Sequence, residues 1–259
     1  MITIKTKKQI EIMVQGGKIL SDVVHEIVGK IKPGVSELEI DKMTQDLIIK
    51  RGAEPAFKMV KGYKHTICST TNNVVVHGIP SEYRYKEGDI AGIDCGALYR
   101  GFYTDMADAV RVTTINHQQL TIDKYKAIDL FLQTGKRALE EAIKVTVPGN
   151  RIGNISEVIQ NIVENSGYSV VRSLVGHGVG KKLHEEPEIP GFIDRDINKT
   201  PLLKEGMTLA IEVIYNMGKS DVVYKGNDHW SIVTKDGSLS AVFEKTIAIT
   251  KKEPVILTK

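Results

Sequence analysis

The sequence contains few of the residues that mark specialised classes of protein. Its 259 residues include only two cysteines, Cys68 and Cys95, which are too few for a disulfide framework and are typical of a reducing compartment. No apolar run approaches the ~18 residues that a membrane-spanning helix needs. Met1 leads into the charged stretch ITIKTKK instead of a secretory signal. We therefore expect a complete cytoplasmic protein that does not enter a membrane.

The sequence also lacks a large excess of charge of either sign. With 41% hydrophobic and 26% charged residues it has the composition of an ordinary globular protein. The net charge of +3 gives no support to a dedicated, specific nucleic-acid binder. A solvated face explains the lysines of IKTKK and KGYK, and a transient contact with an acidic surface such as a ribosome is the second interpretation.

Helix and strand signals alternate along the first half of the chain. The spacings TKKQ and SELE are those of capping boxes, and they predict helices within 6–34 and 36–52. Residues 53–80 have the pattern of extended pieces, among which VVVHGIP is a buried strand that runs into a turn. The strand-like runs 89–98 and 101–112, joined by a short turn, predict a hairpin.

The second half repeats the first in outline. KEGDIAGID at 86–94 is matched without a gap by KEGMTLAIE at 204–212, which aligns Glu212 with Asp94. A two-copy repeat indicates a pseudo-twofold architecture in which the carboxylates of both halves converge.

The helices of the two halves also correspond. Gly17-Lys18 opens a helical run that ends at Pro33-Gly34, and Gly135-Lys136 opens one that ends at Pro148-Gly149. We therefore predict an α+β fold with duplicated halves at about 5–115 and 120–250, each with two helices and an antiparallel sheet. Both halves are expected to lie in a single catalytic domain, 1–259.

Four acidic residues and one histidine stand in or beside apolar, strand-like runs. A carboxylate in such a run, as between Ile93 and Cys95, points into the protein, where an isolated charge is very costly. Several carboxylates together repel one another unless cations neutralise them. Oxygen-rich sites with one imidazole fit two divalent ions of manganese, iron, cobalt or zinc. The sequence thus predicts a two-metal hydrolase, and ordinary surface aspartates are the alternative for the first two members. The five residues are Asp94, Asp105, His177, Glu212 and Glu244.

His177 lies in the glycine-rich stretch VGHGVGKK, which does not have the pattern of a phosphate-binding loop. The required glycine and hydroxyl positions of a Walker sequence are missing, and so is the third glycine of a dinucleotide fingerprint. The glycines instead allow a ligand to approach His177 closely. We expect His184 to face the same cavity, and His77 stands at a strand end, where catalytic groups often lie. A structural role is the alternative for each histidine.

Other residues carry weaker signals. We expect an apolar pocket to be walled by Phe57, Tyr63, Cys68 and Trp230, with core packing as the alternative for each. We expect surface or packing positions for His25, His65, His117 and His229.

Taken together, the motifs resemble the methionine aminopeptidases in their short type I form, and the resemblance covers almost the whole chain. It implies the pita-bread fold and removal of the initiator methionine from nascent proteins. The short interval between His177 and Glu212 lacks the long insert of type II enzymes, and no N-terminal zinc-finger extension is present. The stretches that carry the resemblance are IKPGVSELEID, CSTTNNVVVHGIP, the pair Asp94 and Asp105, GHGVGKKLHEEPEIP, KEGMTLAIE and SLSAVFEKTIAIT.

The resemblance implies roles in binding metal and in catalysis. The five acidic and imidazole residues would hold two divalent ions (cobalt, manganese, iron, zinc or nickel), with Asp105 and Glu244 bridging both. A bridging water or hydroxide would attack the scissile carbonyl, and Glu212 would double as general base. His184 would hydrogen-bond the substrate carbonyl, and His77 would contact the scissile amide nitrogen.

The resemblance also implies how the substrate is held. Tyr63, Cys68 and Trp230 match positions of the methionine pocket, which a thioether side chain suits because it is apolar and adaptable. Phe57 and Val60 occupy wall positions that vary in the family. A monovalent cation is held in some members at the positions of Asn72, Val74 and Ser240.

Two alternatives keep the fold but change the function. An X-Pro-type aminopeptidase would generally carry a large N-terminal domain, for which this chain has no room. A metal-free binding protein would have lost ligands, yet all five candidates are present. A monomer is expected from the resemblance.

Overall fold

The computed structural model describes residues 1–114 and 123–259. His117 lies outside the described residues, as does the expected start of the second half at position 120. Within the described ranges, no helix is both long and apolar enough to cross a membrane.

Two capping boxes begin the first two helices, as predicted. Helix α1 (Lys7–Val28) follows Thr6, and helix α2 (Glu37–Lys50) follows Ser36. In each box the hydroxyl accepts a hydrogen bond from the backbone N–H three residues later. The side chain of that later residue accepts one from the backbone N–H of the cap. Each box therefore satisfies two N–H groups that a helix start leaves without partners.

The predicted hairpin is confirmed and forms one half of the central sheet. Strands β4 (Ile90–Tyr99) and β5 (Phe102–Arg111) pair antiparallel along their whole length. They are joined by Arg100 and Gly101, which both have positive φ, at 48° and 79°. A two-residue turn in which both residues have positive φ matches the right-handed twist of the flanking strands.

The other strands extend this hairpin into one large antiparallel sheet, in the order β1-β4-β5-β12-β9-β7-β8. A smaller sheet has the order β10-β11-β3. Strands β2, β6 and β13 pair with β4, β9 and β12, respectively. The bounds are β1 Glu54–Pro55, β2 Ile67–Thr71, β3 Val74–Val76, β6 Ser169–Val170, β7 Val175–Gly178, β8 Glu185–Pro190, β9 Thr208–Asn216, β10 Val222–Tyr224, β11 Ile232–Thr234, β12 Ser240–Ala248 and β13 Val255–Ile256, with short 3-10 helices η1 Phe57–Met59 and η2 Ile197–Lys199.

Helices α3 (Asp123–Lys144) and α4 (Ile152–Asn165) belong to the second half. The prediction that Gly135 opens a helix was wrong, because Gly135 lies inside α3. A Cβ there would stand 2.5 Å from the Phe243 ring and 2.6 Å from the Tyr215 hydroxyl. Gly17 likewise lies inside α1, where a Cβ would meet the Leu257 carbonyl oxygen at 2.4 Å. Both glycines let a helix approach its neighbour closely, which is why their sequence signal resembled a boundary.

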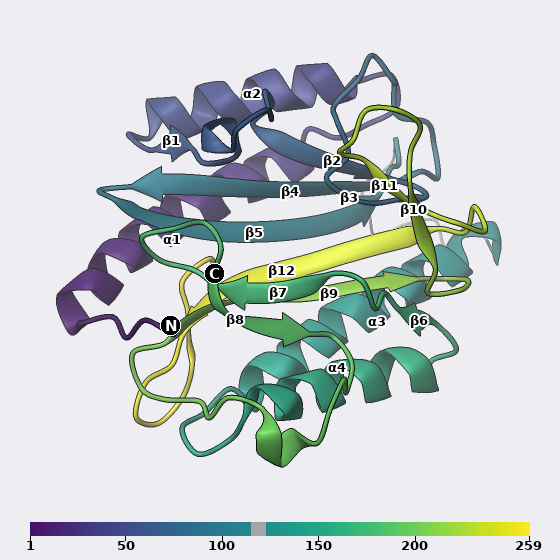
Figure 1. Ribbon diagram of the computed structural model, residues 1–259. Helices are drawn as coiled ribbons and strands as arrows, with labels where there is room; N and C mark the ends of the chain where they lie inside the picture. The colour runs from purple at the N-terminus through teal and green to yellow at the C-terminus, as the bar shows by residue number, and fades with distance from the viewer. Residues whose placement is uncertain (115–122) are drawn as a thin grey trace.

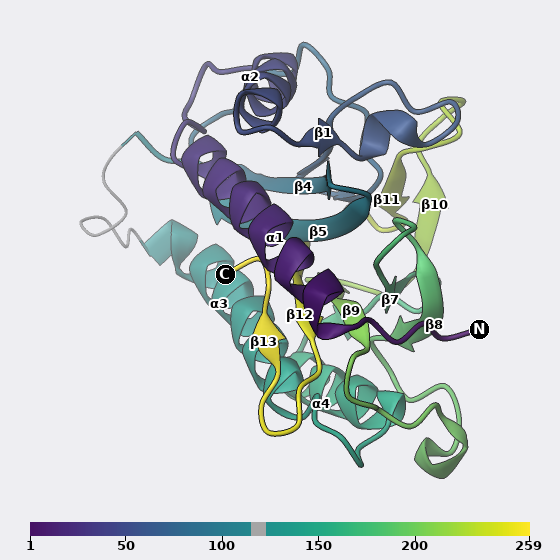
Figure 2. The same ribbon diagram turned by 90° about the vertical axis from the view of Figure 1, so that its left-hand side faces the viewer.

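The four long helices lie on one side of the large sheet, and the small sheet lies on the other (Figure 2). Figure 1 looks onto the side that the helices leave open, with β4 and β5 above β12, β9 and β7. Helix α1 contacts β4 and β5, and α3 contacts β9 and β12. Because apolar cores fill the space between helices and sheet, the open side is free to carry polar groups.

The sheet register agrees with the predicted repeat. β5 and β12 meet at the centre, where Ala107 is the pairing partner of Glu244. One strand further out, Asp94 pairs with Ala107, and Glu212 pairs with Glu244. Asp94 and Glu212 therefore occupy equivalent places on the two sides. We propose that both halves form a single domain, because one sheet runs through them.

The lysine-rich stretches differ from expectation at one position. Lys7, Lys8, Lys61 and Lys64 are exposed, as a solvated face requires. Lys5 is buried, with a side chain only 5% exposed, because its ammonium pairs with Glu185. The expectation of a solvated face was therefore wrong for Lys5.

Candidate metal centre and active site

A single row of the sheet carries three of the candidate acids. Reading across neighbouring strands, the row runs Cys68, Asp94, Ala107, Glu244, Glu212. Residues paired across antiparallel strands point to the same face. The acids, which are far apart in the sequence, therefore lie side by side on the open face of the sheet.

The other two candidates join the row through the period of two along a strand. Asp105 precedes Ala107 by two residues on β5, and His177 pairs with Ala210, two residues before Glu212. Both side chains consequently point to the same face as the row. Ligand atoms of Asp105, His177 and Glu244 lie within 4.8 Å of one another. The structure thus brings together all five side chains that the sequence singled out.

Burial and mutual repulsion act on all four carboxyl groups. Asp105 and Glu244 are only 3% and 2% exposed. Burial is the main reason that the pKa of each of the four groups is raised well above its ordinary value. Repulsion from neighbouring carboxylates raises these pKa values further; the Glu244 carboxyl faces Asp105, Glu212 and Asp94. Positive charge bound among the oxygens would therefore stabilise the cluster.

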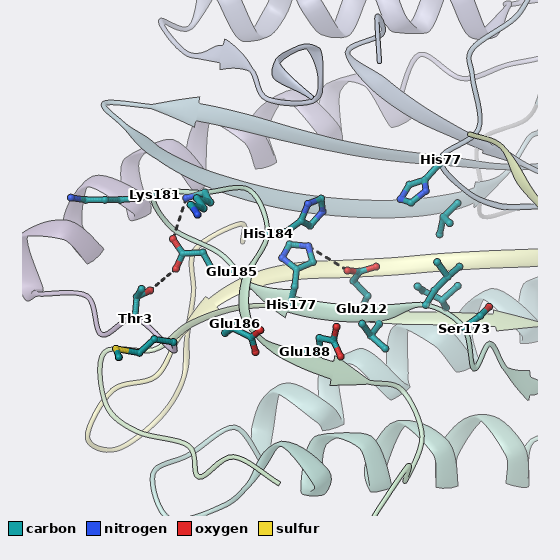
Figure 3. A pocket seen from close by; sticks show the side chains of 16 residues that line it. Thr3, His77, Ser173, His177, Lys181, His184, Glu185, Glu186, Glu188 and Glu212 are labelled. Carbon is teal, nitrogen blue, oxygen red and sulfur yellow. Dashed lines mark hydrogen bonds and ion pairs between the residues drawn. The ribbon is translucent and has the colours of Figure 1, made fainter. Parts of the chain in front are cut away.

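His177 is held in the tautomer that suits a ligand. Its Nδ1–H donates to the carbonyl of Gly178 at 2.8 Å, which leaves the Nε2 lone pair free. Nε2 faces Glu212 Oε1 at 3.5 Å (Figure 3). Burial, together with His184, lowers the pKa of His177 to about 4, so the ring is neutral at pH 7. Two electron-pair donors that face each other at this distance are placed to share a cation, either a metal ion or a proton.

The Glu244 carboxylate also has a buried oxygen that a cation would satisfy. Among the residues that the structure describes, its buried Oε1 is one of a few side-chain atoms without a hydrogen-bond partner. A buried polar atom without a partner is costly unless an ion or water satisfies it. Carboxylate oxygens with one imidazole nitrogen are also a donor set that binds divalent ions. The residues present therefore fit divalent metal.

Thr246 supports the centre and was missed by sequence reasoning. Its hydroxyl accepts from the backbone N–H of Asp105 at 2.8 Å and donates to the backbone carbonyl of Asp105 at 2.7 Å. One side chain thus links β12 to β5 beside the metal ligands. Nothing but its place two residues after Glu244 marks it in the sequence.

His184 and His77 lie at the open side of the centre (Figure 3). The His184 ring is 4.4 Å from the His177 ring and meets it edge to face. His77 has a positive φ of 55°, a strained conformation that is enriched at functional sites. Burial lowers the pKa of both His184 and His77, and both line the same cavity as Glu212. The structure places them as expected, next to the candidate metal ligands.

A small apolar pocket adjoins the Asp94 end of the row. The cavity that includes both this pocket and the metal centre has a volume of about 140 Å³. Tyr63 donates a hydrogen bond to the carbonyl of Ile67 at 2.8 Å, and its ring meets that of Trp230 edge to face at 5.1 Å. The expected wall residues Phe57, Tyr63, Cys68 and Trp230 all line it, together with Val60, Val76 and Leu183. Sequence reasoning missed Val76 and Leu183 as wall residues, because apolar residues in a strand or loop look like core.

A larger and open groove adjoins the Glu212 end. It measures about 700 Å³ and shares His77, His177, His184 and Glu212 with the metal centre. The charged residues Lys181, Lys182, Glu185, Glu186 and Glu188 also line it. The centre therefore adjoins a small pocket with apolar walls at one end and a larger groove with charged residues along it at the other.

The candidates for a monovalent cation site are also close together. The backbone N–H of Ser240 donates to the carbonyl of Asn72 at 2.8 Å. Val74 lies two residues further on, in β3. The Asn72 side chain is engaged elsewhere, with Asp89 and the N–H of Ile90.

Known proteins resemble this chain over its whole length. The sequence matches metallopeptidase family M24 over residues 11–251. Methionine aminopeptidase 1 of Bacillus subtilis is 42% identical over 259 residues, with 100% of both chains covered. The crystal structure of methionine aminopeptidase from Thermotoga maritima is 39% identical, has a TM-score of 0.92 and covers 100% of both chains. Prolidase from Pyrococcus furiosus, at 26% identity, has a TM-score of 0.75 over 99% of this chain and 65% of its own. The resemblance and the pita-bread fold are confirmed, and the chain belongs to metallopeptidase family M24.

Proposed function

We propose that this chain removes the N-terminal methionine from peptides and nascent proteins with the help of two divalent metal ions. The observation that carries the proposal is that four carboxylates and one imidazole share a cavity of about 140 Å³ with apolar wall residues. That volume is below the range of drug-sized ligand pockets and suits a single side chain. Relatives named methionine aminopeptidase match over the full chain.

The residues that would hold the ions are those around the row. Asp105 and Glu244, the most buried carboxylates, are placed between the other ligands and would touch both ions. Bound divalent metal, whether cobalt, manganese, iron, zinc or nickel, would lower the pKa of a water molecule and stabilise negative charge on a carbonyl oxygen. The five ligands would be Asp94, Asp105, His177, Glu212 and Glu244.

Three side chains of this protein would act on the substrate. Glu212, at the open end of the row, would accept the proton of the attacking water. His184 would donate a hydrogen bond to the substrate carbonyl as negative charge develops there. His77, which lines the groove together with His184, would contact the scissile amide nitrogen.

The difference in size between the small pocket and the groove would explain why a single residue is removed. Asp94 pairs with Cys68 across β2 and β4, so its carboxylate adjoins the apolar pocket. A free amino group, which is close to its own side chain, would lie beside Asp94 when that side chain enters the pocket. The rest of the peptide would leave through the groove of about 700 Å³. Methionine suits the pocket because its thioether is apolar, unbranched and adaptable.

An X-Pro-type aminopeptidase is the nearest alternative. The match to prolidase has lower identity and a lower TM-score than the matches to methionine aminopeptidases, and this favours methionine removal. A non-catalytic binding protein is disfavoured because every candidate ligand is in place.

The proposal extends to the setting of the reaction. The enzyme would act as a cytoplasmic monomer, and exposed Lys7, Lys8, Lys61 and Lys64 would support a transient ribosome contact. A monovalent cation would bind near Asn72, Val74 and Ser240.

The test is hydrolysis of the peptide Met-Ala-Ser by protein stripped with chelator and reloaded with cobalt or manganese. We expect release of free methionine and no cleavage of Lys-Pro peptides. Absence of turnover with every divalent metal would overturn the proposal, and preference for X-Pro peptides would favour the alternative.

A further inference from the structure

The segment before α1 reaches the face of the sheet that carries the site. Its backbone is held where the N–H of Lys5 donates to the carbonyl of Gly206 at 2.7 Å. From there the Lys5 ammonium extends to Glu185 Oε2, also at 2.7 Å. The two side chains are only 5% and 7% exposed. A buried ion pair joins positions 180 residues apart in the sequence.

Glu185 connects this segment to the loop between β7 and β8. The hydroxyl of Thr3 donates to the same Oε2 (Figure 3). Lys5 also donates to the Thr3 hydroxyl. The other oxygen, Oε1, accepts from the backbone N–H of Lys182 at 3.1 Å. The Glu185 carboxylate therefore bonds to the backbone of the loop at Lys182 and, through its other oxygen, to the N-terminal segment at Lys5. Leu183 and His184 stand inside the closed loop, and both line the apolar pocket and metal centre.

Gly180 explains how the ammonium comes so close. A Cβ on Gly180 would lie 2.4 Å from Lys5 Cε and 2.7 Å from Nζ. The lysine stem thus packs against bare backbone at the start of the loop. The carbonyl of Gly180 accepts from the N–H of Tyr103 at 2.7 Å, which ties the same point to β5. Lys5 fills the space that a side chain at 180 would occupy, so the loop and the N-terminal segment fit each other as one unit.

We propose that Lys5 is a positioning residue for catalysis: by holding Glu185, it fixes the loop at 180–185 so that His184 faces the metal centre. The proposal rests on the role given to His184 in the proposed function. Lys5 touches neither substrate nor metal and acts only through the loop. The fixed loop is needed because a shift of a catalytic group by about 1 Å can cost about 100-fold in rate.

The test combines kinetics with hydrogen exchange. Lys5→Met keeps the apolar stem but removes the donor, and Lys7→Met, an exposed lysine of the same segment, is the matched control. We expect Lys5→Met to lower kcat for Met-Ala-Ser about 10- to 100-fold in the cobalt-loaded enzyme, and Lys7→Met to leave kcat unchanged. In metal-free protein, amides at 180–185 should exchange faster in Lys5→Met only.

A double variant separates positioning from general destabilisation. In a His184→Ala background, the further change Lys5→Met should lower kcat by less than about threefold, since the group that it positions is already gone. Independent, multiplicative losses would overturn the proposal, as would unchanged exchange at 180–185. If Lys5→Met does not fold, Thr3→Val removes one hydrogen bond to Glu185 without burying a lone charge and should give the same pattern with smaller losses. Failure of the wild type to turn over would refute the proposed function alone, because the exchange experiment still tests the hold of Lys5 on the loop.

Discussion

Replacing Asp105 with asparagine removes one negative charge from the metal centre and leaves the shape of the side chain almost unchanged. Ligand atoms of Asp105 and Glu244 lie within 4.8 Å of each other, and both residues are buried. At an effective dielectric constant of about 20, two unit charges at that distance repel by about 3.5 kcal/mol. Asparagine keeps Oδ1, which accepts from the N–H of Met106 at 3.1 Å, and removes the negative charge.

Two opposite effects follow from this single change. Because the pKa values of both carboxyls are raised, uptake of a proton can relieve part of this repulsion in the wild type, and the substitution gains only the remainder. We therefore expect metal-free Asp105→Asn to be more stable than the metal-free wild type by about 1–3 kcal/mol, which raises Tm by about 2–10 °C. With metal added the order should reverse, and hydrolysis of Met-Ala-Ser should fall at least about 100-fold.

The assay is thermal unfolding of both proteins at pH 7.5, in chelator and in excess cobalt, together with the rate of methionine release. Asp108→Asn is the control, since Asp108 lies on the same strand but pairs with Lys136 at 3.3 Å. Loss of that partly exposed pair should cost at most about 1 kcal/mol and leave activity intact. An Asp105→Asn protein that is less stable in chelator, or that turns over normally, would refute the account of the charge cluster.

Three further changes probe other parts of the molecule. The pKa values of the four carboxyls are raised in the folded state, so these groups should make the metal-free protein less stable as pH rises above their ordinary values of about 4. His177, whose pKa is lowered to about 4, acts in the opposite direction below pH 6.5. Excess metal should abolish the loss, and stability in chelator that does not fall with rising pH would contradict this. His184→Ala should lower kcat about 100- to 1,000-fold while the visible absorption of bound cobalt stays the same, and unchanged kcat would exclude it from catalysis. Gly135→Ala should lower the free energy of unfolding by about 1–3 kcal/mol in denaturant titrations, because its Cβ would meet Phe243 at 2.5 Å, even though alanine has the better helix propensity. Gly29→Ala, whose Cβ would make only ordinary contacts, is the control. Equal stability of the two variants would show that α3 can move away from β12.

Features whose chemistry is local were predictable from the sequence. The capping boxes at Thr6 and Ser36 depend on residues three positions apart, and the β4–β5 hairpin depends on a two-residue turn. The alignment of Glu212 with Asp94 also anticipated their equivalent places, because duplicated segments keep their register. That register is what turned separate acidic residues into one row.

Features that depend on packing between distant segments were not predictable. The sequence pattern at Gly135 predicts a helix boundary, because nothing near it in the sequence indicates that Phe243 and Tyr215 pack against this position of the helix. Lys5 resembled its exposed neighbours Lys7 and Lys8, and only Glu185 distinguishes it.

Ala107 and Glu244 face each other at the middle of the sheet, in places that the repeat makes equivalent. A glutamate at both would crowd a further anion into the centre of the sheet. With alanine at 107, the row carries Asp94 alone on one side of the central strand pair and the neighbouring Glu244 and Glu212 on the other. The ligand positions are therefore unequal within a sheet whose register is symmetric.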